Sequence, residues 1–217
     1  MAADLFDGLD VAGPAREQLA PGAVLLRAFA RPCETQLIAA IEAIITQAPF
    51  RRMVTPGGHQ MSVAMTSCGS FGWVTDRSGY RYDAVDPESG KSWPPMPPLF
   101  RSLAEQAATD AGFPGFAPDS CLINRYEPGA KMSLHQDRDE RDIGAPIVSV
   151  SLGLPATFLF GGLKRTDRTQ RYRLVHGDVV VWGGPARLAF HGVAPLADGE
   201  HGLLGRRRIN LTFRRAQ

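Results

Sequence analysis

The chain has 217 residues, enough for one large domain with an elaborate N-terminal extension. Its 24 Lys and Arg residues nearly balance 22 Asp and Glu, so the net charge of +2 neither requires nor excludes a nucleic-acid partner. Three isolated cysteines argue against a disulfide framework or a zinc ribbon, and neither a signal peptide nor a membrane span is recognisable. We therefore expect a cytoplasmic protein with no membrane partner.

The first half of the chain predicts an arm, two helices and a lid. Residues 1–22 are polar and contain Pro-Gly and Gly-Pro turns, so we expect a loosely held arm, followed by a strand at 24–29. Apolar residues recur at helical spacing in 34–48 and 99–111, which predicts two amphipathic helices. Residues 50–98 combine turn formers with aromatic and basic residues, a composition that favours a ligand-covering lid; the alternative is a surface excursion with Trp73 buried.

Beyond residue 113 the pattern changes to short strands separated by glycine-rich turns. The predicted strands are 120–126, 147–152, 157–160, 171–175, 178–182 and 207–213. Regular short strands without intervening helices predict a sandwich or jelly roll. The expected organisation is an arm at 1–22, an extension with helices and lid at 23–113, and a β core at 114–217, together forming one compact unit.

A metal site is predicted where the segment 121–137 ends. In an extended backbone His135 and Asp137 project to the same side, and an imidazole and a carboxylate with one more imidazole make the facial triad that holds Fe(II). His191 opens a His-Gly turn and is the favoured third ligand, arriving from the opposite side of a jelly roll. The rival pair is His176 and Asp178, for which a turn with a solvent-facing histidine is the preferred interpretation.

The last predicted strand carries two arginines on one face. Arg208, Asn210, Thr212 and Arg214 alternate with Ile209, Leu211 and Phe213. A polar face of this kind is ordinarily a solvated edge, but it is equally suited to a small dianion, because guanidinium binds carboxylate in a bidentate fork. The neutral side chains Asn124 and Tyr126 are placed to support the same anion.

Nine segments carry a family resemblance. They are Met53-Val-Thr-Pro-Gly-Gly58, Met61-Ser-Val-Ala-Met65, Asn124-Arg-Tyr126, His135-Gln-Asp137-Arg-Asp139-Glu140, Ile147-Val-Ser-Val-Ser-Leu152, Phe160-Gly-Gly-Leu-Lys-Arg165, His176-Gly-Asp-Val-Val-Val-Trp-Gly-Gly184, His191-Gly192 and Arg208-Ile-Asn-Leu-Thr-Phe-Arg214. Together they resemble the AlkB family of Fe(II)- and 2-oxoglutarate-dependent dioxygenases. The resemblance implies a mainly β (α+β) fold, with a double-stranded β-helix (jelly roll) core and an N-terminal nucleotide-recognition lid.

The resemblance also implies the cofactor site. His135, Asp137 and His191 would bind Fe(II), with O2 and 2-oxoglutarate as co-substrates. Arg208 is expected near the C1 carboxylate of 2-oxoglutarate and Arg214 at the C5 carboxylate. The neutral residues expected to support the co-substrate are Asn124, Tyr126 and Asn210.

The implied reaction is oxidative demethylation of N-alkylated bases such as 1-methyladenine and 3-methylcytosine. We expect a monomer that acts on alkylated single-stranded DNA, with RNA or duplex DNA carrying a flipped base as further substrates. Trp73 would stack on the base with His135 opposite, and Asp139 would meet its positive charge. The other expected strand contacts are Thr55, His59, Met61, Tyr80, Lys131 and Arg165.

One departure from the family pattern is His59, which stands where the bacterial family pattern has tyrosine after Pro-Gly-Gly. The backbone contact made there is expected to differ. Two other functions stay open at this point: a 2-oxoglutarate-dependent hydroxylase of a protein or small molecule, and a catalytically silent nucleic-acid-binding module.

Overall fold

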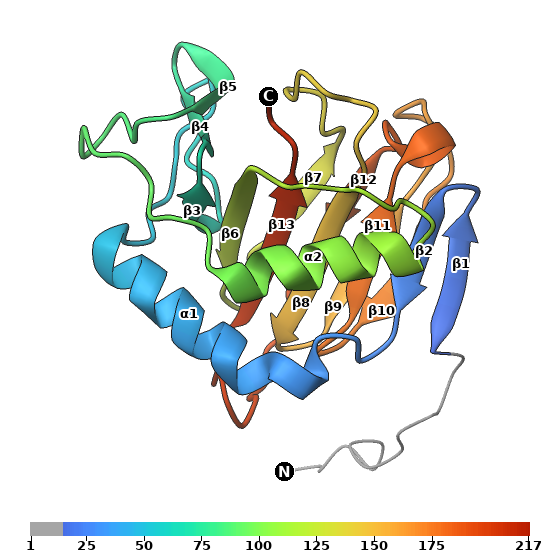
Figure 1. Cartoon of the computed structure of the whole chain (residues 1–217). Coiled ribbons are helices and arrows are strands. Elements are labelled where there is room, and N and C mark those ends of the chain that lie inside the picture. Colours follow the sequence, from blue (N-terminus) through green and yellow to red (C-terminus); the bar gives the residue numbers. More distant parts are fainter. Residues whose placement is uncertain (1–14) are drawn as a thin grey trace.

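The computed structural model describes residues 15–217, so residues 1–14 of the expected arm lie outside the described residues. The chain folds into two β-sheets, a separate hairpin and two covering helices (Figure 1). The strands are β1 (Arg16–Ala20), β2 (Ala23–Leu26), β3 (Ala64–Gly69), β4 (Gly72–Asp76), β5 (Gly79–Asp83), β6 (Ser120–Tyr126), β7 (Met132–His135), β8 (Ile147–Gly153), β9 (Ala156–Phe160), β10 (Gln170–Leu174), β11 (Val179–Trp182), β12 (His191–Val193) and β13 (Arg208–Arg214). The helices are η1 (Arg31–Cys33), α1 (Glu34–Gln47), α2 (Pro98–Asp110) and η2 (Gly184–Ala186).

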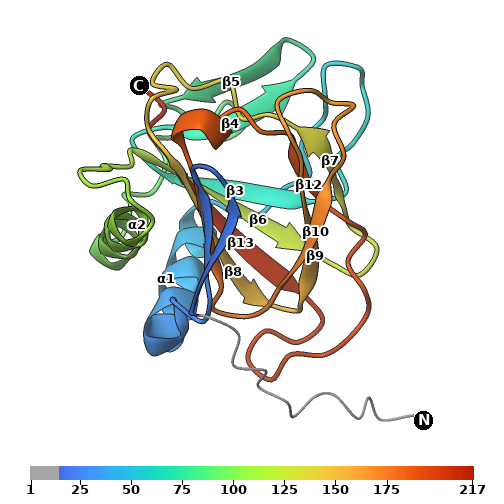
Figure 2. The same cartoon turned by 90° about the vertical axis from the view of Figure 1, so that its right-hand side faces the viewer.

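The larger sheet has seven strands in the order β1-β2-β11-β8-β13-β6-β3, and the smaller sheet has four in the order β10-β9-β12-β7. Figure 2 shows the layers edge-on, with α1 and α2 on one side of the larger sheet and the smaller sheet on the other. Strands β4 and β5 form a hairpin at one end of this arrangement. The sheet order is that of a jelly roll, as the strand pattern predicted.

Strict alternation along the central strands divides the larger sheet into two faces. In β13, Ile209, Leu211 and Phe213 pack under the helices in one apolar core. The intervening β13 residues face the smaller sheet instead, beside a second core that lies between the sheets. Because a strand turns successive side chains to opposite faces, β13 supplies core residues and polar site residues at once.

The helices cover the outer face of the larger sheet, as their apolar spacing predicted. Leu37, Ile41 and Ile44 of α1 are buried, and Phe100 of α2 packs edge-on against Phe213 of β13 with ring centroids 5.9 Å apart. Prolines mark the start of α2, which has Pro98 in its first turn. Among the helices of residues 15–217, none combines the length and apolar character that crossing a bilayer demands.

Several local expectations were wrong. The part of the expected arm that is described is not loosely held, because β1 pairs with β2 in the larger sheet. Strands β3, β4 and β5 lie inside a segment interpreted only as a turn-rich lid. Strand β3 consists mostly of small residues, and β4 and β5 are short and bounded by glycine and aspartate, which are also typical of turns. Local sequence therefore does not distinguish these strands from loop, and pairing with β6 and with each other stabilises them.

Candidate active site

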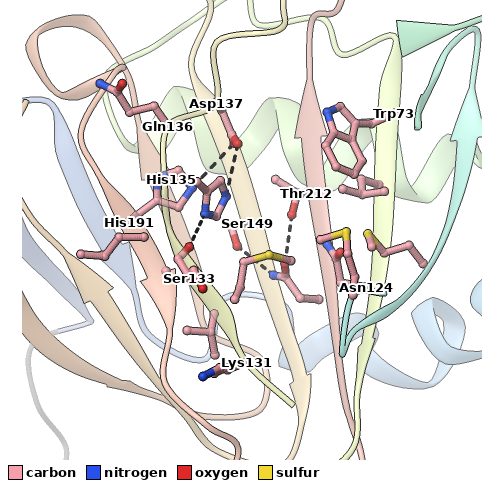
Figure 3. Close-up of a pocket in the computed structure, with 18 of the residues that line it drawn as sticks. Trp73, Asn124, Lys131, Ser133, His135, Gln136, Asp137, Ser149, His191 and Thr212 are labelled. Carbon is pink, nitrogen blue, oxygen red and sulfur yellow. Dashed lines mark hydrogen bonds and ion pairs between the residues drawn. The ribbon is translucent and has the colours of Figure 1, made fainter. Parts of the chain in front are cut away.

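A cavity of about 800 Å³ opens between the two sheets beneath the β4–β5 hairpin (Figure 3). Strands β6, β8 and β13 of the larger sheet contribute one wall, and β7, β9 and β12 of the smaller sheet contribute the other. Residues far apart in the chain, such as Trp73, Asn124 and His191, therefore face the same space. Every iron-binding and co-substrate-binding residue expected from the sequence lines this cavity.

His135, Asp137 and His191 converge on one point. His135 Nε2 lies 3.6 Å from Asp137 Oδ1, and His191 Nε2 lies 3.8 Å from Asp137 Oδ2. Ligands that share one ion at bond lengths of about 2 Å are roughly 3–4 Å apart, so the three groups fit a single metal ion. The set of two imidazoles and one carboxylate is the one that suits Fe(II) and leaves coordination positions open.

Their separation in the chain led us to expect that the two histidines arrive from opposite sides of the jelly roll. This expectation was wrong. They are direct partners on neighbouring antiparallel strands, β7 and β12, and their ring centroids are 4.4 Å apart. Four strands separate the two histidines in the chain: β8 and β11 lie in the larger sheet, and β9 and β10 lie in the smaller sheet with β7 and β12. Pairing in one sheet holds the two imidazoles together without a metal.

Hydrogen bonds orient both imidazoles for metal binding. His135 Nδ1 lies 2.8 Å from the Ser133 carbonyl oxygen, and His191 Nδ1 lies 3.0 Å from that of Ala189. A carbonyl can only accept, so Nδ1 carries the proton and Nε2 is left with a lone pair directed at the site. Burial, together with the nearby His135, lowers the pKa of His191 to about 4, which keeps this ligand neutral at physiological pH.

Asp137 is held ionised by a buried arginine. Arg214 Nε and Nη2 donate to Asp137 Oδ2 over 3.0 and 2.7 Å. Burial opposes ionisation of the carboxyl group, but Arg214, His191 and His135 outweigh it and hold the pKa of Asp137 well below its usual range. The carboxylate is therefore ionised at neutral pH and available to bind a cation.

The wall formed by β6, β8 and β13 presents polar groups that lack partners. Within the described residues, Arg208 Nε and Nη1, Arg214 Nη1 and Asn124 Oδ1 are buried and make no hydrogen bond. Arg208 is 1% exposed and its guanidinium lies 5.0 Å from the Tyr126 ring centroid. Buried donors without partners cost stability, so this wall is built for an anionic ligand that supplies the missing acceptors.

Asn210 lies on the same wall, but its amide is already engaged. Asn210 Nδ2 donates to Ser149 Oγ and to the Val150 carbonyl oxygen, and Thr212 Oγ1 donates to Asn210 Oδ1. These bonds fix the Asn210 side chain as part of the wall between the two arginines. The alternative of a solvated edge for this strand face is wrong, because all four of its polar residues are buried.

The hairpin covers the mouth of the cavity with aromatic side chains. Trp73 and Tyr80 stack with ring centroids 5.7 Å apart, and Trp73 Nε1 donates to Asp139 Oδ2 over 2.9 Å. Trp73 is partly exposed and lines the cavity, so the alternative in which it is a buried structural residue is wrong. The other expected substrate contacts that line the cavity are Thr55, Met61, Lys131, Asp139 and Arg165.

Two histidines outside this site differ from the expectations. His59 is exposed on a turn that closes back on Thr55 and is not among the described residues that line the cavity. His176 is not solvent-facing: it is 6% exposed, accepts a hydrogen bond from the Gly153 amide and lies 3.0 Å from Glu34. Asp178 is likewise buried and binds Arg27, so this pair stabilises the fold.

Sequence reasoning missed a second layer of site residues. Tyr82, Glu140 and Arg187 form hydrogen bonds that reach Arg214 and the backbone of Asp137. Ser149 could have been found, because two serines alternate with valines in β8 and mark a polar face. Nothing in the local sequence separates Glu140 or Arg187 from ordinary surface charges.

Comparisons with known proteins agree with this site. A family model described as the 2OG-Fe(II) oxygenase superfamily matches residues 22–214. The alpha-ketoglutarate-dependent dioxygenase AlkB of Escherichia coli strain K12 is 60% identical over 213 residues, which cover 98% of this chain and 97% of the relative. The nucleic acid dioxygenase ALKBH1 of Mus musculus is 37% identical over 131 residues, 59% of this chain and 33% of the relative.

Among solved structures, that of OsALKBH1 has a TM-score of 0.81 and 29% identity, covering 92% of this chain and 99% of the other. The structural similarity therefore covers most of the chain rather than the metal site alone.

Proposed function

Because the chain belongs to the 2OG-Fe(II) oxygenase superfamily and, within it, to the AlkB family, we propose that it removes alkyl groups oxidatively from bases of single-stranded DNA. It is an Fe(II)- and 2-oxoglutarate-dependent dioxygenase acting on alkylated nucleic acids. The methyl group of the base leaves as formaldehyde, while 2-oxoglutarate and O2 yield succinate and CO2. The observation that carries the proposal is the His135–Asp137–His191 cluster beside two buried arginines with unpartnered donors.

The chain's own residues hold and orient the metal. His135 and His191 would bind Fe(II) through Nε2, and Asp137 through the carboxylate that Arg214 keeps ionised. Bound iron supplies the activation of O2 that none of the protein side chains can provide. Fixing the two Nδ1 protons on backbone carbonyls means that the ligands need no reorganisation when the metal binds.

We propose that the two arginines bind opposite ends of 2-oxoglutarate, in the reverse of the order implied by the resemblance. Arg214 contacts Asp137 and so lies at the metal end, whereas Arg208 lies six positions earlier on the same face of β13, beside Tyr126. The α-keto carboxylate is the end of the co-substrate that can chelate an ion. This geometry favours Arg214 for C1 and Arg208, with Tyr126 and Asn124, for C5.

The aromatic mouth of the cavity suits an unpaired base. Trp73 and His135 both line it, and stacking contributes about 1–3 kcal/mol per base, which offsets the cost of taking the base out of a helix. 1-Methyladenine and 3-methylcytosine are cationic, and Asp139 provides a carboxylate at the same mouth. Lys131 and Arg165 also line the cavity and are suited to phosphate groups of the strand.

The proposed setting is a monomer in a reducing cytoplasm. The three cysteines are free thiols, and one cavity of a single chain contains all the proposed ligands. His59 is proposed to contact the strand outside the cavity, because its turn lies next to Thr55, which lines the mouth.

The test is mass spectrometry of short DNA and RNA strands, each with one defined methyl lesion, after incubation with Fe(II) and 2-oxoglutarate. We expect loss of the methyl group, with formaldehyde and succinate released in equal amounts. Succinate formation with no loss of methyl from any strand would support a hydroxylase of a protein or small molecule instead. Strand binding without succinate formation would identify a catalytically silent module.

The variant Asp137→Ala tests the metal assignment in the same assay. Removal of the carboxylate leaves only two imidazoles for the metal and takes from the buried Arg214 one of its two carboxylate partners, so we expect turnover to fall at least about 100-fold and Mn(II) binding to be lost. Asp198→Ala is the matched control, because Asp198 is exposed, does not line the cavity, and pairs with the exposed Arg206. Full activity of Asp137→Ala would refute the assignment.

A further inference from the structure

Asp139 and Glu140, which follow the proposed iron ligand Asp137, each accept a hydrogen bond from one strand of the lid hairpin, residues 72–83. Trp73 of β4 and Tyr82 of β5 are direct cross-strand partners, so their side chains project from the same face of the hairpin. Trp73 Nε1 donates to Asp139 Oδ2 over 2.9 Å, and Tyr82 Oη donates to Glu140 Oε1 over 2.6 Å. The hairpin is therefore fastened to the chain segment that carries a metal ligand.

The two contacts differ in their environment. Asp139 is exposed at the cavity mouth, where its proposed role is to meet a cationic base, so its contact with Trp73 can be exchanged for one with substrate. Glu140 is 6% exposed and does not line the cavity. Its bond to Tyr82 has no competitor from the substrate and can persist throughout a reaction.

Glu140 is also joined to the metal end of the site. Its Oε2 accepts from Arg187 Nη2 over 3.0 Å, and its Oε1 lies 3.3 Å from Arg214 Nε. Arg214 in turn binds the Asp137 carboxylate, and Arg187 Nη1 donates to the Asp137 carbonyl oxygen. A single buried carboxylate thus contacts the hairpin and both arginines that hold Asp137.

The charges of this group are balanced. We define the Glu140 cluster as Tyr82, Glu140, Arg187 and Arg214, which together with Asp137 contains two cations and two carboxylates. Burial raises the pKa of Tyr82 well above its ordinary value, so its hydroxyl is a permanent donor. Buried ionic networks are costly to break at one member, because the remaining charges lose their partners.

We propose that Glu140 is a positioning residue that couples the lid hairpin to the metal end of the active site. Its oxygens set the position of Tyr82 and the orientation of the arginines that hold Asp137, so the hairpin and the metal ligand are ordered together. The substrate-related part of this inference rests on the proposed function, whereas the coupling itself is a property of the fold.

Hydrogen–deuterium exchange of the hairpin amides tests the coupling directly. In Tyr82→Phe, which loses only the hydroxyl, we expect amides of residues 72–83 to exchange about tenfold faster, while those of β6 and β13 are unchanged. Tyr172→Phe is the matched control, because Tyr172 also loses one hydroxyl hydrogen bond, to the Leu19 carbonyl oxygen, outside the site. Unchanged exchange of the hairpin in Tyr82→Phe would overturn the proposal.

Addition of Mn(II) and 2-oxoglutarate gives the second readout. In wild type we expect the two ligands to slow exchange of the hairpin, because ordering Asp137 and Arg214 also orders Glu140. Glu140→Ala is expected to lose this transmitted protection, and Glu140→Gln, which keeps an oxygen for Tyr82, is expected to restore part of it. If the two ligands slowed exchange of the hairpin equally in wild type and in Glu140→Ala, Glu140 would not couple the hairpin to the metal end of the site.

Steady-state kinetics separates positioning from general loss of structure. For Tyr82→Phe we expect KM for the methylated strand to rise about three- to tenfold, with kcat and KM for 2-oxoglutarate changed less than about twofold. A fall in kcat alone would contradict the assignment. If wild type demethylates no strand, the proposed function fails while the exchange measurements still decide the coupling.

Discussion

Arg208 is a buried cation that retains two donors without partners among the described residues. Its Nη2 donates to Ser151 Oγ, and the rest of the guanidinium faces the cavity. Burial lowers the pKa of Arg208, because removal from water disfavours the charged form of the guanidinium. Such a group is explained by binding rather than by stability, since a co-substrate carboxylate can supply both missing acceptors.

Substitution of Arg208 is expected to separate binding from stability. In Arg208→Met the KM for 2-oxoglutarate should rise at least about tenfold, because a charge-assisted pair contributes about 1.5–3 kcal/mol. The free energy of unfolding in urea, measured without ligands, should stay constant or increase, since a buried unpaired charge is removed. An unchanged KM would exclude Arg208 from the co-substrate site.

Substitution of Trp73 is expected to weaken binding of the nucleic-acid strand without changing binding of the metal or of 2-oxoglutarate. In Trp73→Ala the KM for a methylated strand should rise about tenfold, the lower part of the range for loss of base stacking, and Trp73→Phe should recover part of the loss. Binding of Mn(II) and 2-oxoglutarate, followed by calorimetry, should be unchanged, because Trp73 contacts Asp139 and Tyr80 but none of the proposed metal ligands. A weakened metal affinity would contradict this division.

At the scale of elements, the lid is also held to the core by side-chain contacts of residues outside its two strands. Asp86 follows the hairpin, is 5% exposed, and accepts hydrogen bonds from Arg51 Nη1 over 2.8 Å and from Ser89 Oγ over 2.7 Å. Arg51 itself pairs through its backbone with Met65 of β3. The segment after the hairpin is therefore bound to the edge of the larger sheet through Arg51, whose buried partner is Asp86 and whose exposed partner is Glu88.

Asp86→Asn should destabilise the protein in a pH-dependent way. Burial opposes its ionisation, but bonds from Arg51, Ser89 and the Glu88 amide lower the pKa of Asp86 from 3.8 to about 2. The pKa of Asp86 is lower in the folded state than in the unfolded state. The contribution of the ionised carboxylate to the free energy of unfolding is therefore complete above pH 3.8 and is lost as the pH falls through about 2. We expect Asp86→Asn to cost about 2 kcal/mol at pH 7 and progressively less in urea titrations below pH 4.

The control for this prediction is Asp198→Asn, whose pair with Arg206 is exposed and whose loss should leave the unfolding midpoint unchanged. A cost for Asp86→Asn that stays constant between pH 7 and pH 3 would show that the carboxylate charge is not its cause.

At the scale of the whole molecule, the active site joins the two sheets. The smaller sheet supplies His135 and His191, and the larger sheet supplies Arg208 and Arg214. A ligand set that contacts both walls therefore binds only when the sheets are correctly packed. Binding to the folded state alone stabilises it by mass action.

Mn(II) together with 2-oxoglutarate should therefore raise the midpoint of thermal unfolding. At 100 times the dissociation constant each ligand adds about 2.7 kcal/mol, and for a domain of this size about 5 °C or more is expected. Asp137→Ala should lose the response to Mn(II), and Arg208→Met should lose most of the response to 2-oxoglutarate. A full response in Asp137→Ala, measured by calorimetry, would contradict the proposed metal site.

The sequence by itself determined the features that rest on local periodicity and on residue chemistry. Helical spacing predicted α1 and α2, and period-two alternation predicted both faces of β13, because burial of one face of an element leaves a repeat that can be read directly. The chemistry of imidazole and carboxylate selected His135, Asp137 and His191, which the fold brings together. Strands β3 to β5 escaped prediction, since long-range pairing stabilises them.

Only the tertiary structure decided which groups meet across the chain. The pairing of His135 with His191 in one sheet, the burial of His176 against Glu34, and the contact of Arg214 with the metal end all depend on strand order. So does the bond between Tyr82 and Glu140. These contacts leave no periodic signal in the sequence, because they join buried partners that are distant along the chain. The type of a charged residue also does not reveal whether its side chain is solvated or buried.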